Sequence, residues 1–243
     1  MTAVLNEQGQ PLGRELPGWQ PRPLPAGKVL EGQYCRLEPV DAGRHAESLS
    51  QAYAAAGPGA WTYLPADPPS APADVHAWLQ RLADAVTERY YAIVDLASGQ
   101  ALGSVALMRM DPANGVIEVG SVAYSPALRR TRAATEAQYL LMRHVFDDLG
   151  YRRYEWKCNA LNQPSRAAAL RLGFTFEGIF RQAAVQRGRS RDTAWFSILD
   201  EEWPQLARAF QAWLEPANFD ADGRQRRSLE ALRLAGDGTA AEM

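Results

Sequence analysis

Two points at which a strand runs directly into a helix, both between residues 116 and 173, constrain the fold of this chain most strongly. A β-branched run over residues 116–124 leads into a turn with several arginines, and a strongly periodic helix follows at once. Further on, a second strand leads into a helix that begins near Asn162 and Ser165. Helix N-termini present free N–H groups and a positive dipole end, which suit an anionic phosphate group. The pattern therefore predicts a bound phosphorylated cofactor with reactive groups beside it.

The composition favours a globular, cytoplasmic protein. The 243 residues are 47% hydrophobic and include 7 tryptophans, which is ample for a buried core. The net charge of −2 directs the chain neither to nucleic acid nor to an anionic membrane, so neither partner is expected. Cys35 and Cys158 are too few for a disulfide framework and fit a reducing compartment. We find no signal pattern and no apolar run long enough to span a bilayer, and we expect a cytoplasmic location.

Hydrophobic periodicity and turn residues predict the order β-α-α-β-β-β-α-β-α-β-β with a terminal helix. The expected strands span residues 34–37, 90–96, 102–110, 116–124, 154–160, 174–186 and 192–199. The expected helices span residues 41–56 (Asp41 as cap), 73–88, 133–149, 164–172 and 203–214. Three hairpin-connected strands followed by a strand–helix–strand crossover imply an α/β fold on one mixed sheet.

The chain divides into an arm, one domain and a tail. Residues 1–30 hold 5 prolines between positions 11 and 25, which predicts an extended N-terminal arm with Trp19 and Leu24 as candidate anchors. Residues 31–214 contain all the periodic segments and are expected to form a single domain. Residues 215–243 are rich in alanine, glycine and charge, and we expect a C-terminal tail.

Two short blocks follow the strands at the two junctions. Residues 129–134 read R-R-T-R-A-A, and residues 162–174 read N-Q-P-S-R-A-A-A-L-R-L-G-F. The first resembles the acetyl-CoA signature Arg/Gln-x-x-Gly-x-Gly/Ala of the GNAT superfamily of N-acetyltransferases, with Arg132 where the usual first glycine stands. The second is similar to the N-x-x-S…R-L-G-F block of the RimJ/RimL-like branch. Together the blocks identify roughly residues 30–200 as a member of this branch.

The resemblance implies the GNAT acyl-CoA N-acyltransferase fold, acetyl-CoA as acetyl donor, no metal, and direct attack of a primary amine on the thioester. The turn at residues 129–135 would hold the pyrophosphate, and a backbone N–H near residues 120–122 would polarise the thioester carbonyl. Asn162 would bond the pantetheine amides. The coenzyme-binding residues implied are Val119, Gly120, Ser121, Val122, Arg129, Arg130, Thr131, Arg132, Ala133, Ala134, Thr135, Asn162 and Ser165.

The resemblance also supplies two catalytic candidates. Glu118, the only carboxylate within the fourth strand, is the candidate base, and the alternative is a solvated or ion-paired strand residue. Ser165 is the candidate acid or thiolate-stabilising group, and the alternative is a helix cap. Trp61 and Tyr63 lie in a proline-rich loop and are expected either to line the acceptor pocket or to anchor the core.

Alternatives remain open at this point. The acceptor is a protein N-terminal amine or a small-molecule amine. A non-catalytic acyl-CoA binding or sensing module is the second hypothesis, since it would keep the turn at residues 129–135 without needing Glu118 or Ser165. An unrelated nucleotide binder is disfavoured because no G-x-G-x-x-G or G-x-x-x-x-G-K-[ST] pattern follows a strand. A monomer and a homodimer are both compatible with the sequence.

Overall fold

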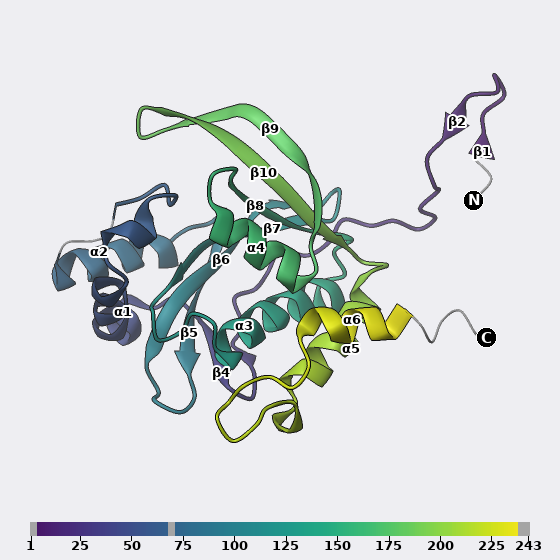
Figure 1. Ribbon diagram of the computed structural model, residues 1–243. Coiled ribbons are helices and arrows are strands. Elements are labelled where there is room, and N and C mark those ends of the chain that lie inside the picture. Colours follow the sequence, from purple (N-terminus) through teal and green to yellow (C-terminus); the bar gives the residue numbers. More distant parts are fainter. Residues whose placement is uncertain (1–3, 68–70, 238–243) are drawn as a thin grey trace.

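An eight-stranded mixed sheet organises the computed structural model, which describes residues 4–67 and 71–237 (Figure 1). All neighbouring strands are antiparallel except β7 and β8, which are parallel. In sheet order the strands are β3 (Leu30–Glu31), β4 (Cys35–Pro39), β5 (Arg89–Asp95), β6 (Ala101–Asp111), β7 (Val116–Tyr124), β8 (Arg153–Asn159), β10 (Arg189–Leu199) and β9 (Thr175–Gln186).

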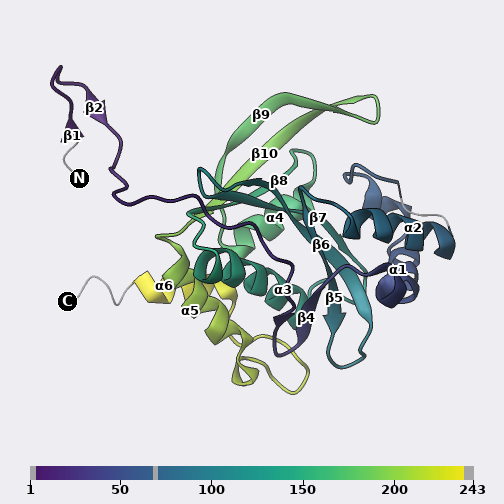
Figure 2. The same ribbon diagram turned by 180° about the vertical axis from the view of Figure 1, so that it is seen from behind.

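Helices cover both faces of the sheet, as Figures 1 and 2 show. On one side lie α1 (Ala42–Ala56), the short η1 (Pro58–Trp61) and α2 (Pro72–Ala83). On the other lie α3 (Arg132–Arg143), which continues as the π-helical turn η2 (His144–Asp148), α4 (Gln163–Leu172) and α5 (Trp203–Leu214). Strand β5 explains the two layers, because Tyr91 and Ile93 join one hydrophobic core while Ala92 and Val94 join the other. The predicted α/β fold on one mixed sheet is confirmed.

Strands β7 and β8 pair only along their first halves. Their ladder ends where Val119 lies opposite Trp156, so the backbone of β7 from Gly120 onward has no strand on that edge. The register between β6 and β7 slips between Gly120 and Ala123, and Ser121 has φ 49°, which together define a β-bulge. The bulge turns β7 away from β8 and opens a gap in the middle of the sheet.

The prediction of a tail from residue 215 is wrong for the part that the structure describes. A short helix η3 (Pro216–Asn218) and α6 (Leu229–Asp237) fold back onto the domain (Figure 1). Leu229 is 1% exposed, and the ring of Phe219 packs edge-on against Trp213 at 5.1 Å. The apolar residues are few and widely spaced, so their packing partners were not visible in the sequence. Residues 238–243 lie outside the described part.

The N-terminal arm runs outward from the body, ending in a small hairpin of β1 (Val4–Leu5) and β2 (Pro11–Leu12) (Figure 2). Trp19 anchors it as expected, because its Nε1 donates to the carbonyl of Ala113 at 2.8 Å. Leu24 does not, since its side chain is 58% exposed. Within the described residues, no helix combines the length and the apolar character that crossing a membrane requires.

Candidate active site

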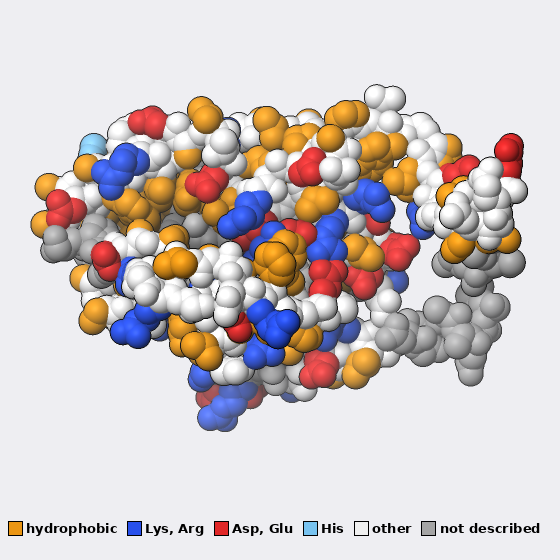
Figure 3. All heavy atoms as spheres, turned by 90° about the horizontal axis from the view of Figure 1, so that it is seen from above, with side chains coloured by type: hydrophobic (Ala, Val, Ile, Leu, Met, Phe, Trp, Pro, Cys, Tyr) orange, Lys and Arg blue, Asp and Glu red, His pale blue; other side chains and the backbone are white. Residues whose placement is uncertain are grey.

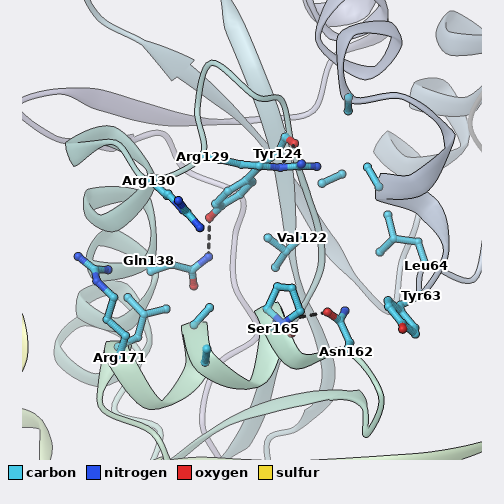
Figure 4. A pocket seen from close by; sticks show the side chains of 18 of the residues that line it. Tyr63, Leu64, Val122, Tyr124, Arg129, Arg130, Gln138, Asn162, Ser165 and Arg171 are labelled. Carbon is cyan, nitrogen blue, oxygen red and sulfur yellow. Dashed lines mark hydrogen bonds between the residues drawn. The ribbon is translucent and has the colours of Figure 1, made fainter.

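A cavity of about 880 Å³ opens where β7 and β8 part (Figure 4). Its walls come from α1 and the loop after it, from β7 and the start of α3, and from α4. Arg129, Arg130 and Arg171 stand toward one end, whereas Tyr63 and Leu64 stand at the other. We call these the cationic end and the aromatic end.

The turn before α3 forms the cationic end. Thr131 caps the helix, its Oγ1 accepting a hydrogen bond from the Ala134 N–H at 3.1 Å. None of the hydrogen bonds found among the described residues uses the backbone N–H groups of Arg130, Arg132 or Ala133. Arg130 has φ 62°, a left-handed conformation that lets successive N–H groups converge on one point. Free N–H groups beside the arginine side chains fit a pyrophosphate.

The Arg132 side chain points away from the cavity. Its guanidinium stacks on the ring of Phe219 at 3.9 Å and approaches Tyr34 at 5.4 Å. Arginine is thus accommodated at the position where the family signature has glycine because its side chain turns outward. Only the backbone N–H of Arg132 remains available to a phosphate.

The start of α4 brings Asn162 and Ser165 into the cavity wall (Figure 4). Asn162 is the cap of this helix, its Oδ1 accepting from the Ser165 N–H at 3.2 Å. The alternative of Ser165 as cap is therefore wrong. The Ser165 Oγ accepts a hydrogen bond from Trp156 Nε1 at 3.0 Å, so its own O–H is the remaining donor, with Cys158 within hydrogen-bonding reach. Buried Cys158 is a further neighbour; burial raises the pKa of its thiol and Ser165 opposes that effect.

Glu118 lies beside the gap but does not line the cavity. It is 5% exposed, and its Oε2 is 3.0 Å from Lys157 Nζ and 3.2 Å from Arg109 Nε. Burial raises the pKa of Glu118 above its usual value, although Lys157 and Arg109 act in the opposite direction. Oε1 points along β7 and lies 3.5 Å from where a Cβ on Gly120 would stand. The ion-paired alternative is present in the structure, and the role of Glu118 as base stays a prediction.

The Glu118–Lys157 pair continues as a row of alternating charges across the sheet. Lys157 Nζ is 2.7 Å from Glu155 Oε2 and 3.8 Å from the centre of the Trp195 ring. Arg153 then bonds Glu155 at 2.7 Å and Glu177 at 2.6 Å. Figure 3, which views the molecule from above, shows acidic and basic side chains intermixed on that face. A face with such mixed charges has no large positive patch that would attract a polyanion.

The aromatic end is built by the loop after α1. Trp61 is 3% exposed and packs edge-on against Tyr53 at 5.2 Å and Trp78 at 5.9 Å, so it anchors the core and lines the cavity at once. The hydroxyl of Tyr63 donates to the carbonyl of Leu161 at 3.4 Å. This bond links the loop to the start of α4 on the other side of the gap.

The tip of the β9–β10 hairpin joins the same loop. Gln186 Nε2 donates to the carbonyl of Leu64 at 3.0 Å. Arg187 bonds the carbonyl of Ala66 at 2.6 Å and the carboxylate of Asp67 at 2.8 Å. The hairpin and the loop therefore bridge above the aromatic end.

Among the cavity residues that sequence reasoning missed are two glutamines and an arginine, Gln138, Gln225 and Arg171. Gln138 donates from Nε2 to the Tyr124 hydroxyl at 2.7 Å, while its buried Oε1 has no partner among the described residues. Arg171 belongs to the L-R-L-G-F block, but the block does not tell which way its side chain points. Gln225 comes from the segment expected to be a tail, so no signal pointed to it.

Two of the three histidines, His45 and His144, have partners within the fold. His45 Nε2 lies 3.0 Å from Glu38, and His144 Nδ1 lies 2.7 Å from Asp148. Across residues 4–67 and 71–237, no group of His, Cys, Asp and Glu side chains is arranged to hold a metal ion. The site as described thus consists of polar, cationic and aromatic groups.

The GNAT acetyltransferase domain model matches residues 35–175, more than half of the chain. The protein therefore belongs to the GNAT acetyltransferase family. It is an N-acetyltransferase, as the sequence blocks predicted, and members of this family use acetyl-CoA.

Individual relatives agree with this class. A solved GCN5-related N-acetyltransferase from Brucella melitensis is 51% identical, with a TM-score of 0.88 over 90% of this chain and 99% of that one. The "Putative ribosomal N-acetyltransferase YdaF" of Bacillus subtilis is 28% identical over 69% of this chain and 90% of its own length. RimL, a ribosomal L7/L12 alpha-N-protein acetyltransferase solved in complex with coenzyme A, shares the fold, with 20% identity and a TM-score of 0.60 over 71% of this chain and 98% of that one. The predicted membership of the GNAT family is confirmed, and the name of the Bacillus subtilis relative agrees with the RimJ/RimL-like branch.

Proposed function

We propose that this enzyme transfers an acetyl group from acetyl-CoA to a primary amine that enters at the aromatic end of the cavity. The observation that carries the proposal is the division of one cavity into two chemically different ends with the strand gap between them. The cationic end suits the pyrophosphate, and Ser165 lies on the wall between the ends.

Acetyl-CoA supplies the acetyl group as a thioester. The free backbone edge of β7 beyond Val119 is the candidate for polarising the thioester carbonyl, because its N–H groups have no strand partner there. Ser165 is the candidate donor to the leaving sulfur. A free thiol has a pKa of about 8.5, so a single hydrogen bond is enough to stabilise the departing thiolate.

Glu118 is the candidate for removing the proton from the acceptor amine. Its Oε1 is the oxygen directed along β7, while Oε2 faces Lys157 and Arg109. Because Glu118 does not line the cavity, a bridging water between Glu118 and the amine is part of the proposal.

The acceptor is a protein N-terminal amine or a small-molecule amine. The name of the Bacillus subtilis relative, a ribosomal N-acetyltransferase, favours the first. The hairpin and the loop are joined across the aromatic end by hydrogen bonds, and we expect this cover to favour an acceptor that presents its amine on a narrow chain.

Thiol release from acetyl-CoA, measured with short peptides and with small amines, tests the proposal. The same samples are examined by thermal unfolding, in which saturating coenzyme at a hundredfold excess over Kd adds about 2.7 kcal/mol. Release with at least one amine class supports the enzyme and identifies the acceptor. A thermal shift without release from any amine would favour the non-catalytic binding module instead.

A cytoplasmic location and the choice between monomer and homodimer stay predictions. The projecting hairpin carries exposed Val4, Leu5 and Leu12, a surface that a second copy would cover. Light scattering behind size exclusion, on the full chain and on a chain lacking residues 1–16, decides between the two states.

A further inference from the structure

We propose that the segment after α5 builds the nucleotide end of the coenzyme site, where Arg171 binds the 3′-phosphate of the ADP moiety. The inference rests on the proposed function. It concerns a segment that lies outside the matched family region, residues 35–175.

Arg171 stands in the cationic end of the cavity (Figure 4). Its Nη1 donates to Thr135 Oγ1 at 3.2 Å, and Thr135 lies in the first turn of α3. The guanidinium therefore sits one helical turn from the N–H groups assigned to the pyrophosphate. A second phosphate group of the same ligand is within reach at this distance.

The Arg171 guanidinium has no carboxylate partner among the described residues. Surrounding protein atoms lower its pKa, and no acidic neighbour opposes that effect. The side chain nevertheless remains open to the cavity. A partly desolvated cation without an anion is unfavourable, and a phosphate dianion would satisfy it with charge-assisted hydrogen bonds.

The C-terminal segment fixes the position of Arg171. The guanidinium lies 5.1 Å from the centre of the Trp213 ring, and Trp213 Nε1 donates to Gln225 Oε1 at 2.8 Å. Gln225 itself lines the cavity. Aromatic packing and a hydrogen bond thus connect α5, the loop after it and the cation into one unit.

Arg132 provides an independent reason to link the segment with the coenzyme turn. It stands where the family signature has glycine, and its guanidinium stacks on Phe219 at 3.9 Å. Phe219 is paired with Gln225 by an isolated antiparallel bridge. The unusual arginine therefore holds the loop that carries Gln225 against the start of α3.

Calorimetric titration with coenzyme A and with dephospho-coenzyme A, which lacks the 3′-phosphate, tests the inference without relying on activity. We expect the wild type to bind coenzyme A at least about tenfold more tightly. In Arg171→Gln we expect this preference to disappear, because the affinity for coenzyme A falls to that for dephospho-coenzyme A. Arg208→Gln, an exposed arginine on α5, is the matched control and keeps the preference.

Gln225→Ala tests the positioning role, with a loss of about two- to fivefold for coenzyme A and none for dephospho-coenzyme A. Arg171→Lys keeps the charge and is expected to restore part of the preference. Equal affinity of the wild type for both ligands, or an unchanged preference in Arg171→Gln, would overturn the inference while leaving the proposed function intact. If the wild type bound neither ligand, the proposed function itself would fail.

Discussion

The two ends of the cavity are built in opposite ways. The cationic end comes mainly from one continuous stretch, β7 through the first turns of α3, whose N–H groups are fixed by helix geometry. The aromatic end comes from a loop and a hairpin more than a hundred residues apart, joined by bonds from Gln186 and Arg187 to that loop. We therefore propose that the first end, fixed by helix geometry, binds the coenzyme, and that the second end selects the acceptor.

The gap between the ends is where substitutions should have the largest effect. Glu118→Gln is expected to lower kcat about a hundredfold, because the variant loses a general base. The Kd of acetyl-CoA should stay unchanged, because no contact with the coenzyme is lost. Burial raises the pKa of Glu118 above its usual 4.5, so the acid limb of the pH profile of kcat/KM lies above pH 4.5 and disappears in the variant.

Glu177→Gln, in the same row of charges but beyond Arg153, serves as the control for Glu118. It should keep both kcat and the pH profile. An unchanged pH–rate profile in Glu118→Gln removes this residue from the mechanism.

Ser165→Ala is expected to reduce kcat by a smaller factor, about tenfold, because the departing thiolate is already a stable leaving group. Steady-state thiol release measures the effect, and Ser190→Ala on the exposed hairpin is the control. Full activity of Ser165→Ala would show that the Ser165 hydroxyl only bonds to Trp156 and takes no part in catalysis.

At the aromatic end, Arg187→Gln removes the bonds to Ala66 and Asp67. The acceptor KM should rise about two- to fivefold, as expected for an exposed ion pair, with the Kd of acetyl-CoA unchanged. Arg189→Gln, exposed on the same hairpin, should change neither quantity. A loss of coenzyme affinity in Arg187→Gln would show that the two ends are not independent.

The last prediction concerns the stability of the α1 layer behind the aromatic end and leaves catalysis unchanged. Burial tends to raise the pKa of Glu38, but hydrogen bonds from Arg36, Arg44 and His45 outweigh it and lower the pKa to about 2. The stabilisation is present above pH 4.5 and is lost as the pH falls toward 2.

The free energy of unfolding falls by about 2 kcal/mol over this pH range. The fall is smaller than the pKa shift alone would give, because solvent screens the charge of Arg44. Denaturant unfolding at several pH values measures it. In Glu38→Gln the unfolding free energy should be lower at neutral pH and change less between pH 4.5 and 2. A pH dependence identical to that of the wild type would exclude this cluster as the cause.

The elements that the sequence predicts well are those fixed by neighbouring residues, as at the cationic end. β7 and α5 have the predicted bounds because alternation or helical periodicity meets clear turn and cap residues at both ends. α2 ends at Ala83 instead of residue 88, since Val86 is 86% exposed and has no core to pack against. Local pattern predicts an element only where a buried surface lies opposite it.

For the site, the sequence blocks located the start of α3 and of α4, because those junctions depend on neighbouring residues. They did not show that Arg132 turns outward or that Gln225 enters the cavity. They also did not show that Lys157, on the neighbouring strand β8, forms an ion pair with Glu118. These features depend on contacts between distant segments, which one sequence does not reveal.

The central claim, that the start of α3 binds the coenzyme, is tested most directly by calorimetric titration of acetyl-CoA into the wild type and Ala134→Glu. Ala134 lines the cationic end, so the new carboxylate would face the pyrophosphate. We predict one-to-one binding by the wild type and a loss of at least about a hundredfold in the folded variant. Absence of binding by the wild type, or equal affinity in Ala134→Glu, would contradict the account.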